Sequence, residues 1–427
     1  MSVGVEDDDE HEHEDEDDRG LLREDRNQYK RIKSANLSPM DLIHELVDNE
    51  KRRREAFPIC EHNIFMAHAG VTALPRVVAD AVIGCTEESA TNFANFTALR
   101  QKLQDARISA ARLIGSTPEE IALLGPTSLG LSLFANGIDW KPSDEVVCYL
   151  DDYPANVYPW LNLRARGVNV RLLKPAEPGA LTPELVARAL TPKTRLVALA
   201  SCNFLSGYRV DIDAIGRLLR EKEILFSVDA IQTLGAFPTT VEYVDLLSAD
   251  AHKWMLGPLA IGIVYIRKEL FDLCRPTLLG AWNVKAPEYV AQEVIEFHPT
   301  AQRYEPGALN VMGILGMKAA IDLLLDIGID NVADRVRKIT TRFADGLAAL
   351  GFTTLGPTGG QHGSGILTVS RPTTDMPALF ERLSAAHIVC SPRQDRQGRR
   401  YIRFSPHFYN TDAEVDEVLK VMANGER

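Results

Sequence analysis

The chain of 427 residues is 45% hydrophobic and 25% charged, the balance of a folded globular protein long enough for two domains. Its net charge of −12 disfavours nucleic acid as a partner. No uninterrupted apolar run is long enough for a membrane-spanning helix, and the acidic N-terminus lacks the apolar segment of a secretory signal. We therefore expect a cytoplasmic protein that neither crosses nor binds a membrane.

The cysteine pattern agrees with that compartment. The six cysteines are scattered and form no CxxC pair: Cys60, Cys85, Cys148, Cys202, Cys274 and Cys390. Such spacing favours reduced thiols over a disulfide framework or a zinc site. We expect no metal site.

The N-terminal region is predicted in two parts. Residues 1–24 contain the like-charge block "EDDDEHEHEDEDD" and are expected to be a disordered acidic tail. Residues 25–60 are expected to be a helical segment that contributes to a small domain. The stretch "LSPMDLIHELVDNEKRRREAF" predicts a helix that Ser38 caps, with Pro39 in its first turn.

Residues 61–312 alternate short apolar runs with helical patterns. The predicted strands are 145–150, 168–173, 195–201, 224–229 and 260–266, and helical stretches such as "PELVARAL" and "IDAIGRLLREK" lie between them. This alternation predicts a large α/β domain with a mainly parallel sheet covered on both faces. Residues 313–427 are predicted to form a linking helix and a small α+β domain.

Polar residues follow several of the predicted strands. Ligands of open α/β sheets bind at the carboxyl ends of the strands. There the sequence places "DDYPANVYPW" after 145–150, "CNFLSG" after 195–201, Asp229 at the end of 224–229, and "SADAHK" after the apolar run 244–247. The turn "LLGPTSLGLSLFANG" could offer backbone N–H groups to a phosphate, although a Thr/Ser helix cap is the commoner explanation of such a turn.

The chemistry depends on Lys253 and Asp229. A plain ion pair between them is the simplest interpretation, because a buried ammonium needs a partner. However, pyridoxal phosphate (PLP) accounts for all these segments together. It needs a lysine for a Schiff base, a carboxylate at its ring nitrogen, a flat side chain over its face and a helix N-terminus at its phosphate. The glycine fingerprints of dinucleotide and P-loop sites are absent from the sequence, which disfavours an NAD-linked enzyme.

These motifs resemble those of the class V aminotransferases, fold type I PLP-dependent enzymes, in the branch with cysteine desulfurases, selenocysteine lyases and isopenicillin N epimerases. The matching pieces run in order over residues 60–424: "HAGVTALP", "GPTSLGL", "DYPANVYPW", "CNFLSG", "SVDAIQTLG", "DAHKWMLGP", "RYEPGALN" and "IRFSPHFYNT". The resemblance implies a large domain with a mainly parallel seven-stranded sheet flanked by helices, a small α+β domain, and a homodimer.

The resemblance also implies a role for each matching residue. Lys253 and Asp229 would be catalytic, as the Schiff-base lysine and the partner of the ring nitrogen. Further contacts to the cofactor would come from Thr127, Ser128 and His252 at the phosphate, Gln232 at the phenolic oxygen, Tyr153 over the ring and Asn203. Arg403, with Asn203, would bind the substrate carboxylate, which a guanidinium group matches bidentately. The alternative for Arg403 is a surface arginine at a strand end.

The sequence departs from the family pattern at three places. Asp250 replaces a serine of the desulfurases and suits a phosphate poorly, so we expect it to hydrogen-bond His252 or to face away. Ala308 replaces a hydroxyl residue with which a neighbouring subunit commonly contacts the phosphate. The loop "SPRQDRQGRR" contains no cysteine, and Cys390 before it is expected to be a buried structural thiol. The missing loop cysteine and the expected burial of Cys390 disfavour a desulfurase that uses a protein persulfide.

The predicted function is aminotransferase-type chemistry on an amino acid or similar amino-carboxylate. The alternatives are a C–S or C–Se lyase, an amino-acid epimerase and, less favoured, a non-catalytic PLP-fold binding protein. The three reactions share nearly all of the residues named above, so the motifs do not separate them. Retention of both Lys253 and Asp229 speaks against the non-catalytic alternative.

Overall fold

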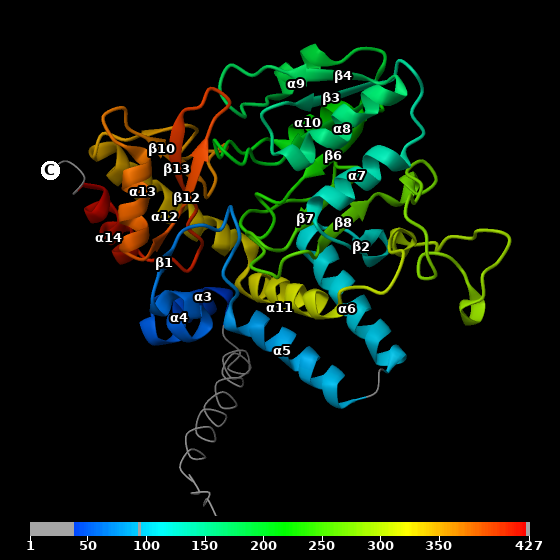
Figure 1. Cartoon of the computed structure of the whole chain (residues 1–427), viewed down its shortest axis with the longest axis horizontal. Coiled ribbons are helices and arrows are strands. Elements are labelled where there is room, and N and C mark those ends of the chain that lie inside the picture. Colours follow the sequence, from blue (N-terminus) through cyan, green and yellow to red (C-terminus); the bar gives the residue numbers. More distant parts are fainter. Residues whose placement is uncertain (1–37, 93–94, 424–427) are drawn as a thin grey trace, which may run out of the picture.

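The computed structural model describes residues 38–92 and 95–423. The predicted acidic tail lies outside this part of the chain. The described residues form a larger lobe around one sheet and a smaller lobe built mainly from the C-terminal part (Figure 1). The domain boundaries predicted from the sequence remain predictions.

The large lobe contains a seven-stranded sheet in the order β2-β8-β7-β6-β5-β3-β4. Only β8 runs antiparallel to its neighbours, so the predicted mainly parallel sheet is confirmed. The strands are β2 (Ile121–Leu123), β3 (Glu145–Tyr149), β4 (Asn169–Leu173), β5 (Thr194–Ala200), β6 (Leu225–Asp229), β7 (Leu246–Asp250) and β8 (Gly262–Ile266). All five strands predicted by residue range are present, and the apolar run 244–247 leads into β7.

Both faces of the central strands are buried, which explains why these strands are nearly continuous apolar runs, whereas the edge strand β4 exposes Asn169 and Arg171. Along β3, Val147 belongs to a core on one face and Val146 to a core on the other. The helices of the first face are α6 (Phe96–Ile114), α9 (Pro183–Ala189), α10 (Ile212–Arg220) and α11 (Val311–Ile327), with α5 (Arg76–Thr91) packed on α11. The second face is covered by α7 (Thr127–Gly137) and α8 (Tyr158–Asn162).

The small lobe contains an antiparallel four-stranded sheet in the order β12-β13-β10-β9. Its strands are β9 (Thr353–Thr354), β10 (Leu367–Ser370), β12 (Ser391–Gln394) and β13 (Arg400–Phe404), and its helices are α12 (Ile329–Ala349), α13 (Met376–Ala385) and α14 (Asp412–Ala423). A parallel pair of β1 (Ile64–Phe65) and β11 (Ile388–Val389) joins an N-terminal segment to this lobe.

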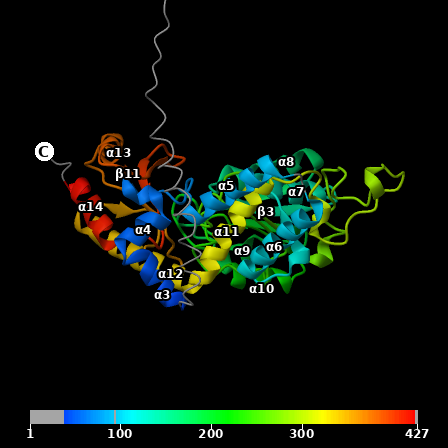
Figure 2. The same ribbon diagram turned by 90° about the horizontal axis from the view of Figure 1, so that it is seen from below.

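The first helical stretch differs from its prediction, because it forms two helices, α3 (Pro39–Val47) and α4 (Glu50–Ala56). Ser38 caps α3 through Asp41 N, as expected. Asn49 caps α4 by accepting a hydrogen bond from Arg52 N, and this local bond competes with continuation of the first helix. Both helices lie beside α12 and α14 when the molecule is seen from below (Figure 2).

Short 3-10 turns complete the described elements: η1 (Pro58–Glu61), η2 (Pro118–Glu120), η3 (Pro154–Asn156), η4 (Leu163–Arg166), η5 (Lys268–Leu270), η6 (Pro287–Tyr289) and η7 (Ala301–Tyr304). None of the described helices has the length and apolarity that a membrane crossing requires.

Candidate active site

A cavity of about 440 Å³ is lined by residues of both lobes. This volume is in the range of small-molecule sites. The cavity brings together eight of the nine predicted site residues: Thr127, Ser128, Tyr153, Asp229, Gln232, His252, Lys253 and Arg403. It is also lined by Arg393 and Phe204. Asn203 is not among its lining residues.

Lys253 follows the end of β7 and is only 7% exposed. Burial lowers the pKa of its amine to about 8; the nearby Asp229 carboxylate opposes this shift, and Arg403 and Arg393 add to it. Its Nζ lies 5.2 Å from the centre of the Tyr153 ring. An amine with a lowered pKa has a larger neutral, nucleophilic fraction near neutral pH.

Asp229 is the last residue of β6 and is almost completely buried. One of its carboxylate oxygens, Oδ1, accepts a hydrogen bond from Ile231 N at 3.0 Å. Burial raises the pKa of Asp229 to about 6, while the hydrogen bond from Ile231 and the charge of Lys253 oppose the shift. The carboxylate therefore favours a cationic partner inside the cavity.

The orientation of the Gln232 amide is determined by Trp254. The indole Nε1 of Trp254 donates a hydrogen bond to Gln232 Oε1 at 2.9 Å, and Gln232 Nε2 donates to Ala69 O at 3.2 Å. Because an indole nitrogen only donates, Oε1 must face Trp254. Nε2 has a second N–H, which suits an acceptor oxygen of a ligand in the cavity that Gln232 lines.

His407 holds the backbone next to Lys253. Its Nδ1 accepts a hydrogen bond from Phe408 N at 2.8 Å, so the proton of the neutral ring is on Nε2. Nε2 then donates to Trp254 O at 3.0 Å. Burial lowers the pKa of His407 to about 4, which keeps the ring neutral. The carbonyl that follows Lys253 is thus fixed by a buried imidazole.

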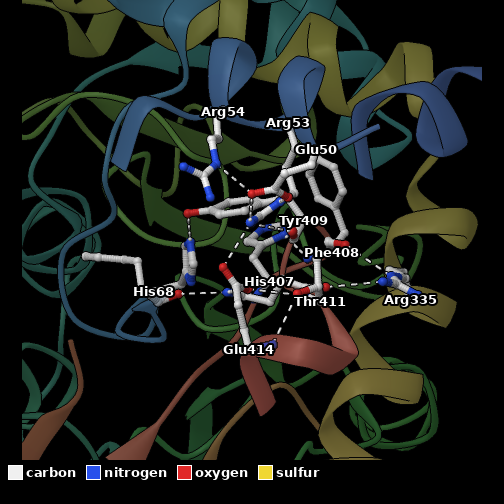
Figure 3. A network of polar contacts seen from close by, with 12 residues as sticks. Glu50, Arg53, Arg54, His68, Arg335, His407, Phe408, Tyr409, Thr411 and Glu414 are labelled. Atoms are coloured by element: carbon white, nitrogen blue, oxygen red, sulfur yellow. Dashed lines mark hydrogen bonds and ion pairs between the residues drawn. The ribbon is translucent and has the colours of Figure 1, made fainter. Parts of the chain in front are cut away.

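A wider buried network supports this contact (Figure 3). Tyr409 OH lies 2.8 Å from His68 Nε2 and donates to it, because His68 Nδ1–H donates to Ser405 O. Glu414 accepts hydrogen bonds from Arg53 of α4 and from Asn410, each at 2.9 Å. The motif "SPHFYNT" therefore forms a polar framework that joins α4, the small lobe and the segment after Lys253.

The N-terminus of α7 forms another part of the cavity wall. The Thr/Ser helix cap, which is the commoner explanation of such a turn, is absent here, because the N-cap residue is Pro126 and makes no side-chain cap. Instead Thr127 Oγ1 accepts a hydrogen bond from Asp250 N at 2.8 Å. The first backbone N–H groups of α7 and Ser128 suit a phosphate at this position.

Asp250 lies behind this wall and does not line the cavity. Its Oδ1 accepts from Ala251 N and Ile261 N, and its Oδ2 is 3.1 Å from His252 Nδ1. The contact with His252 is close, but it is not a hydrogen bond. Asp250 therefore faces away from the phosphate position, whereas its neighbour His252 lines the cavity.

Arg403 is 1% exposed, which contradicts the alternative of a surface arginine. Its Nη1 donates to Phe204 O at 2.7 Å, whereas Nε and Nη2 have no hydrogen-bond partner among the described residues. Burial lowers its pKa to about 9. Unpartnered N–H groups on a buried guanidinium that lines a cavity fit an anionic group of a ligand.

Asn203 and Cys390 have structural surroundings. The Asn203 amide donates to Asp151 O and accepts from Leu205 N and Ser206 N, so it organises a turn beside the cavity. The substrate contact predicted for it remains a prediction. Cys390 is buried as expected, and burial raises the pKa of its thiol to about 12. All six cysteines are unpaired and buried.

The residues present fit PLP. The α7 N-terminus and His252 suit the phosphate, Asp229 suits the ring nitrogen, and the free N–H of Gln232 suits the phenolic oxygen. Tyr153 lines the cavity beside Lys253. Sequence reasoning missed Arg393, Phe204, Trp254 and His407. Of these four, only Arg393 left a signal in the sequence, because it would share a face with Arg403 if residues 391–404 form a hairpin.

Comparisons with known proteins agree with this fit. The Aminotransferase class-V family profile matches residues 64–418. A probable cysteine desulfurase of Methanothermobacter thermautotrophicus is 29% identical over 67% of this chain and 73% of its own length. The uncharacterised aminotransferase YcbU of Bacillus subtilis is 26% identical over 87% of this chain and 96% of its own length.

A cysteine desulfurase of Thermococcus onnurineus, solved in its apo form, superposes with a TM-score of 0.80 at 23% identity, covering 87% of this chain and 96% of its own. This similarity confirms the predicted fold. Because the family profile spans most of the sequence, the chain belongs to the class V aminotransferase family of PLP-dependent enzymes.

Proposed function

We propose that this enzyme acts on an α-amino acid or a similar amino-carboxylate and carries out aminotransferase-type chemistry. The main support for this proposal is that one cavity holds Lys253 with a lowered pKa, the buried Asp229 and a buried Arg403 whose remaining N–H groups have no partner among the described residues. When bound, PLP supplies an electron sink that weakens the bonds at the substrate's α-carbon.

The side chains of this chain have separate tasks in that reaction. Lys253 holds the cofactor and, once its Nζ is free, moves a proton at the substrate α-carbon. Asp229 holds a proton on the ring nitrogen. Arg403 orients the substrate carboxylate. The hydrogen bond from His407 to Trp254 O holds the backbone that carries Lys253.

A C–S lyase is the second candidate, favoured by the relatives whose names are cysteine desulfurases. In such a reaction the sulfur would leave as a small product, because the 391–400 loop has no cysteine and the Cys390 thiol is buried. A keto acid formed together with sulfide would support this candidate.

The test begins with the visible spectrum of the purified protein, before and after addition of single amino acids. We expect a visible cofactor band that converts to the pyridoxamine form, and borohydride reduction should attach the cofactor covalently to the peptide that contains Lys253. Lys253→Ala should lose both signals, whereas Lys222→Ala, a change at an exposed lysine, should keep them. Label that remains in Lys253→Ala would contradict the assignment.

Asp229→Ala provides the second arm of the test. It should retain part of the cofactor but lose turnover, because the ring nitrogen would no longer be held in its protonated form. Turnover that equals that of the unchanged protein would mean that Asp229 does not act at the ring nitrogen.

The protein is further proposed to work as a homodimer in the cytoplasm. The support is a run of exposed apolar side chains after β8, which includes Leu279, Val290, Val294 and Ile295, with Val294 at 79% exposure. Exposed apolar clusters commonly mark association surfaces. Ala308, the position at which the family resemblance implies a neighbouring subunit near the phosphate, is also exposed, ahead of α11. Sedimentation should give a mass twice that of the chain, and Val294→Glu should lower the measured mass. A monomer at micromolar concentration would contradict the dimer.

A further inference from the structure

We propose that Arg393 and Arg403 form two separate anion positions, so that the substrate is an amino acid with a second negatively charged group on its side chain. This inference rests on the proposed function. It assigns Arg393 as the residue that determines specificity for an acidic side chain, such as a carboxylate or a sulfinate.

The first support is the placement of the two arginines. In the antiparallel pair of β12 and β13, Arg393 lies opposite Tyr401 and Ser391 lies opposite Arg403. Because side chains alternate along a strand, Arg393 and Arg403 are diagonal neighbours on the same face of the hairpin. Both line the cavity that contains Lys253.

The second support is that neither guanidinium has a carboxylate partner among the described residues. Arg403 donates from Nη1 to Phe204 O, and Arg393 donates from Nη1 to Pro392 O at 3.1 Å. The Nε atoms of both and Nη2 of Arg403 are buried without a partner. The acidic residue of their own hairpin, Asp395, is bound by Tyr401 OH and by backbone N–H groups of the turn.

The third support is the charge that these side chains bring to one wall. Burial lowers the pKa of Arg393, and burial together with repulsion from Arg393 lowers that of Arg403. Two neighbouring cations with unpartnered N–H groups are unfavourable unless anions bind to them. The cofactor phosphate would not meet this need, because Thr127, Ser128 and His252 supply its position.

The hairpin that carries Arg393 is held in place across the cavity. Arg396 forms an ion pair with Asp151 and donates from Nη2 to Leu150 O at 3.1 Å, directly after β3. Tyr153, two residues after Asp151, lines the same cavity. A substrate between Tyr153 and the hairpin would therefore present its α-carboxylate to one arginine and its side-chain anion to the other.

Equilibrium binding separates this proposal from the proposed function. Succinate and butyrate have similar chains, but only succinate has a second carboxylate, and neither has an amino group that could react. Calorimetric titration of the PLP-loaded protein should show succinate binding about tenfold or more tighter than butyrate. Arg393→Gln should remove this preference, and Arg393→Lys should restore part of it.

Kinetics with matched amino acids provide the second measurement. Arg393→Gln should lower kcat/KM about tenfold to a hundredfold for aspartate or glutamate and less than about threefold for alanine or 2-aminobutyrate. The cofactor spectrum should stay unchanged. An equal loss for both substrate sets would mean that both arginines hold one carboxylate, and it would overturn the proposal, as would the lack of a succinate preference. Failure of the proposed function would instead leave the protein without any reaction with amino acids, while the succinate preference could still be measured.

Discussion

Acid should destabilise the folded protein through His407, and the size of the effect follows from its surroundings. The buried ring accepts a hydrogen bond from Phe408 N at Nδ1, so a proton on Nδ1 would remove this bond and place a charge on a completely buried ring. Its pKa is lowered to about 4 in the folded state, compared with about 6.5 in an unfolded chain. Between these pH values the unfolded state binds the additional proton, so the free energy of unfolding falls as the pH falls.

The expected loss is about 2 kcal/mol between pH 7 and pH 5 and about 3 kcal/mol when the pH reaches 4, at 1.36 kcal/mol for each pH unit of pKa difference. His407→Gln keeps a donor for Trp254 O but has no ring to titrate. Over the same pH range its free energy of unfolding should therefore fall less than that of the unchanged protein, and the difference should equal the loss given above. Urea unfolding of both proteins at pH 7 and pH 5, followed by tryptophan fluorescence, measures the difference.

His62→Gln is the matched control, because the His62 side chain is 84% exposed. This variant should lose stability on acidification as the unchanged protein does. If His407→Gln also loses as much stability as the unchanged protein between pH 7 and pH 5, then His407 does not remain neutral in the folded state, and the hydrogen-bond assignment of its ring is wrong.

Three further changes test the positions around the cavity. In the cofactor-free protein, acylation of the Lys253 amine should titrate near pH 8, and Arg403→Gln should move this midpoint upward because it removes a nearby positive charge; an unchanged midpoint would contradict the electrostatic argument. Gly130→Ala should lower both stability and PLP affinity, because an added Cβ would lie 2.4 Å from Ser248 Oγ and push α7 off the sheet. If thermal unfolding and cofactor titration both match those of the unchanged protein, α7 can adapt to the added methyl group. Trp254→Phe should remove the donor that orients Gln232, at a cost of about 1–3 kcal/mol of stability, and should shift the visible band of the bound cofactor; a band at the original wavelength would mean that the Gln232 amide does not depend on the indole.

Asp250 shows how a departure from a family pattern can be accommodated. A carboxylate at the phosphate position would repel the ligand, but here the side chain is turned behind the cavity wall and lies 3.1 Å from His252. Its other oxygen accepts two backbone hydrogen bonds. The negative charge is thus held behind the cavity wall and does not contact a ligand in the cavity.

Five of the seven strands of the large sheet, several of its helices and the candidate carriers of the chemistry could be predicted from the sequence alone. Its apolar strands alternate with amphipathic stretches, and that alternation depends only on local periodicity. Asp229 and Lys253 could be assigned because Asp229 ends one apolar strand and Lys253 follows shortly after another, where the carboxyl ends of strands form a binding edge.

How distant residues meet became visible only in the folded chain. It placed Arg393 beside Arg403, joined the buried His407 to the backbone after Lys253, and turned Asp250 away from the cavity. It also left Asn203 outside the cavity wall. These features depend on strand register, on side-chain direction and on contacts between residues more than a hundred positions apart, and local periodicity contains no information about them.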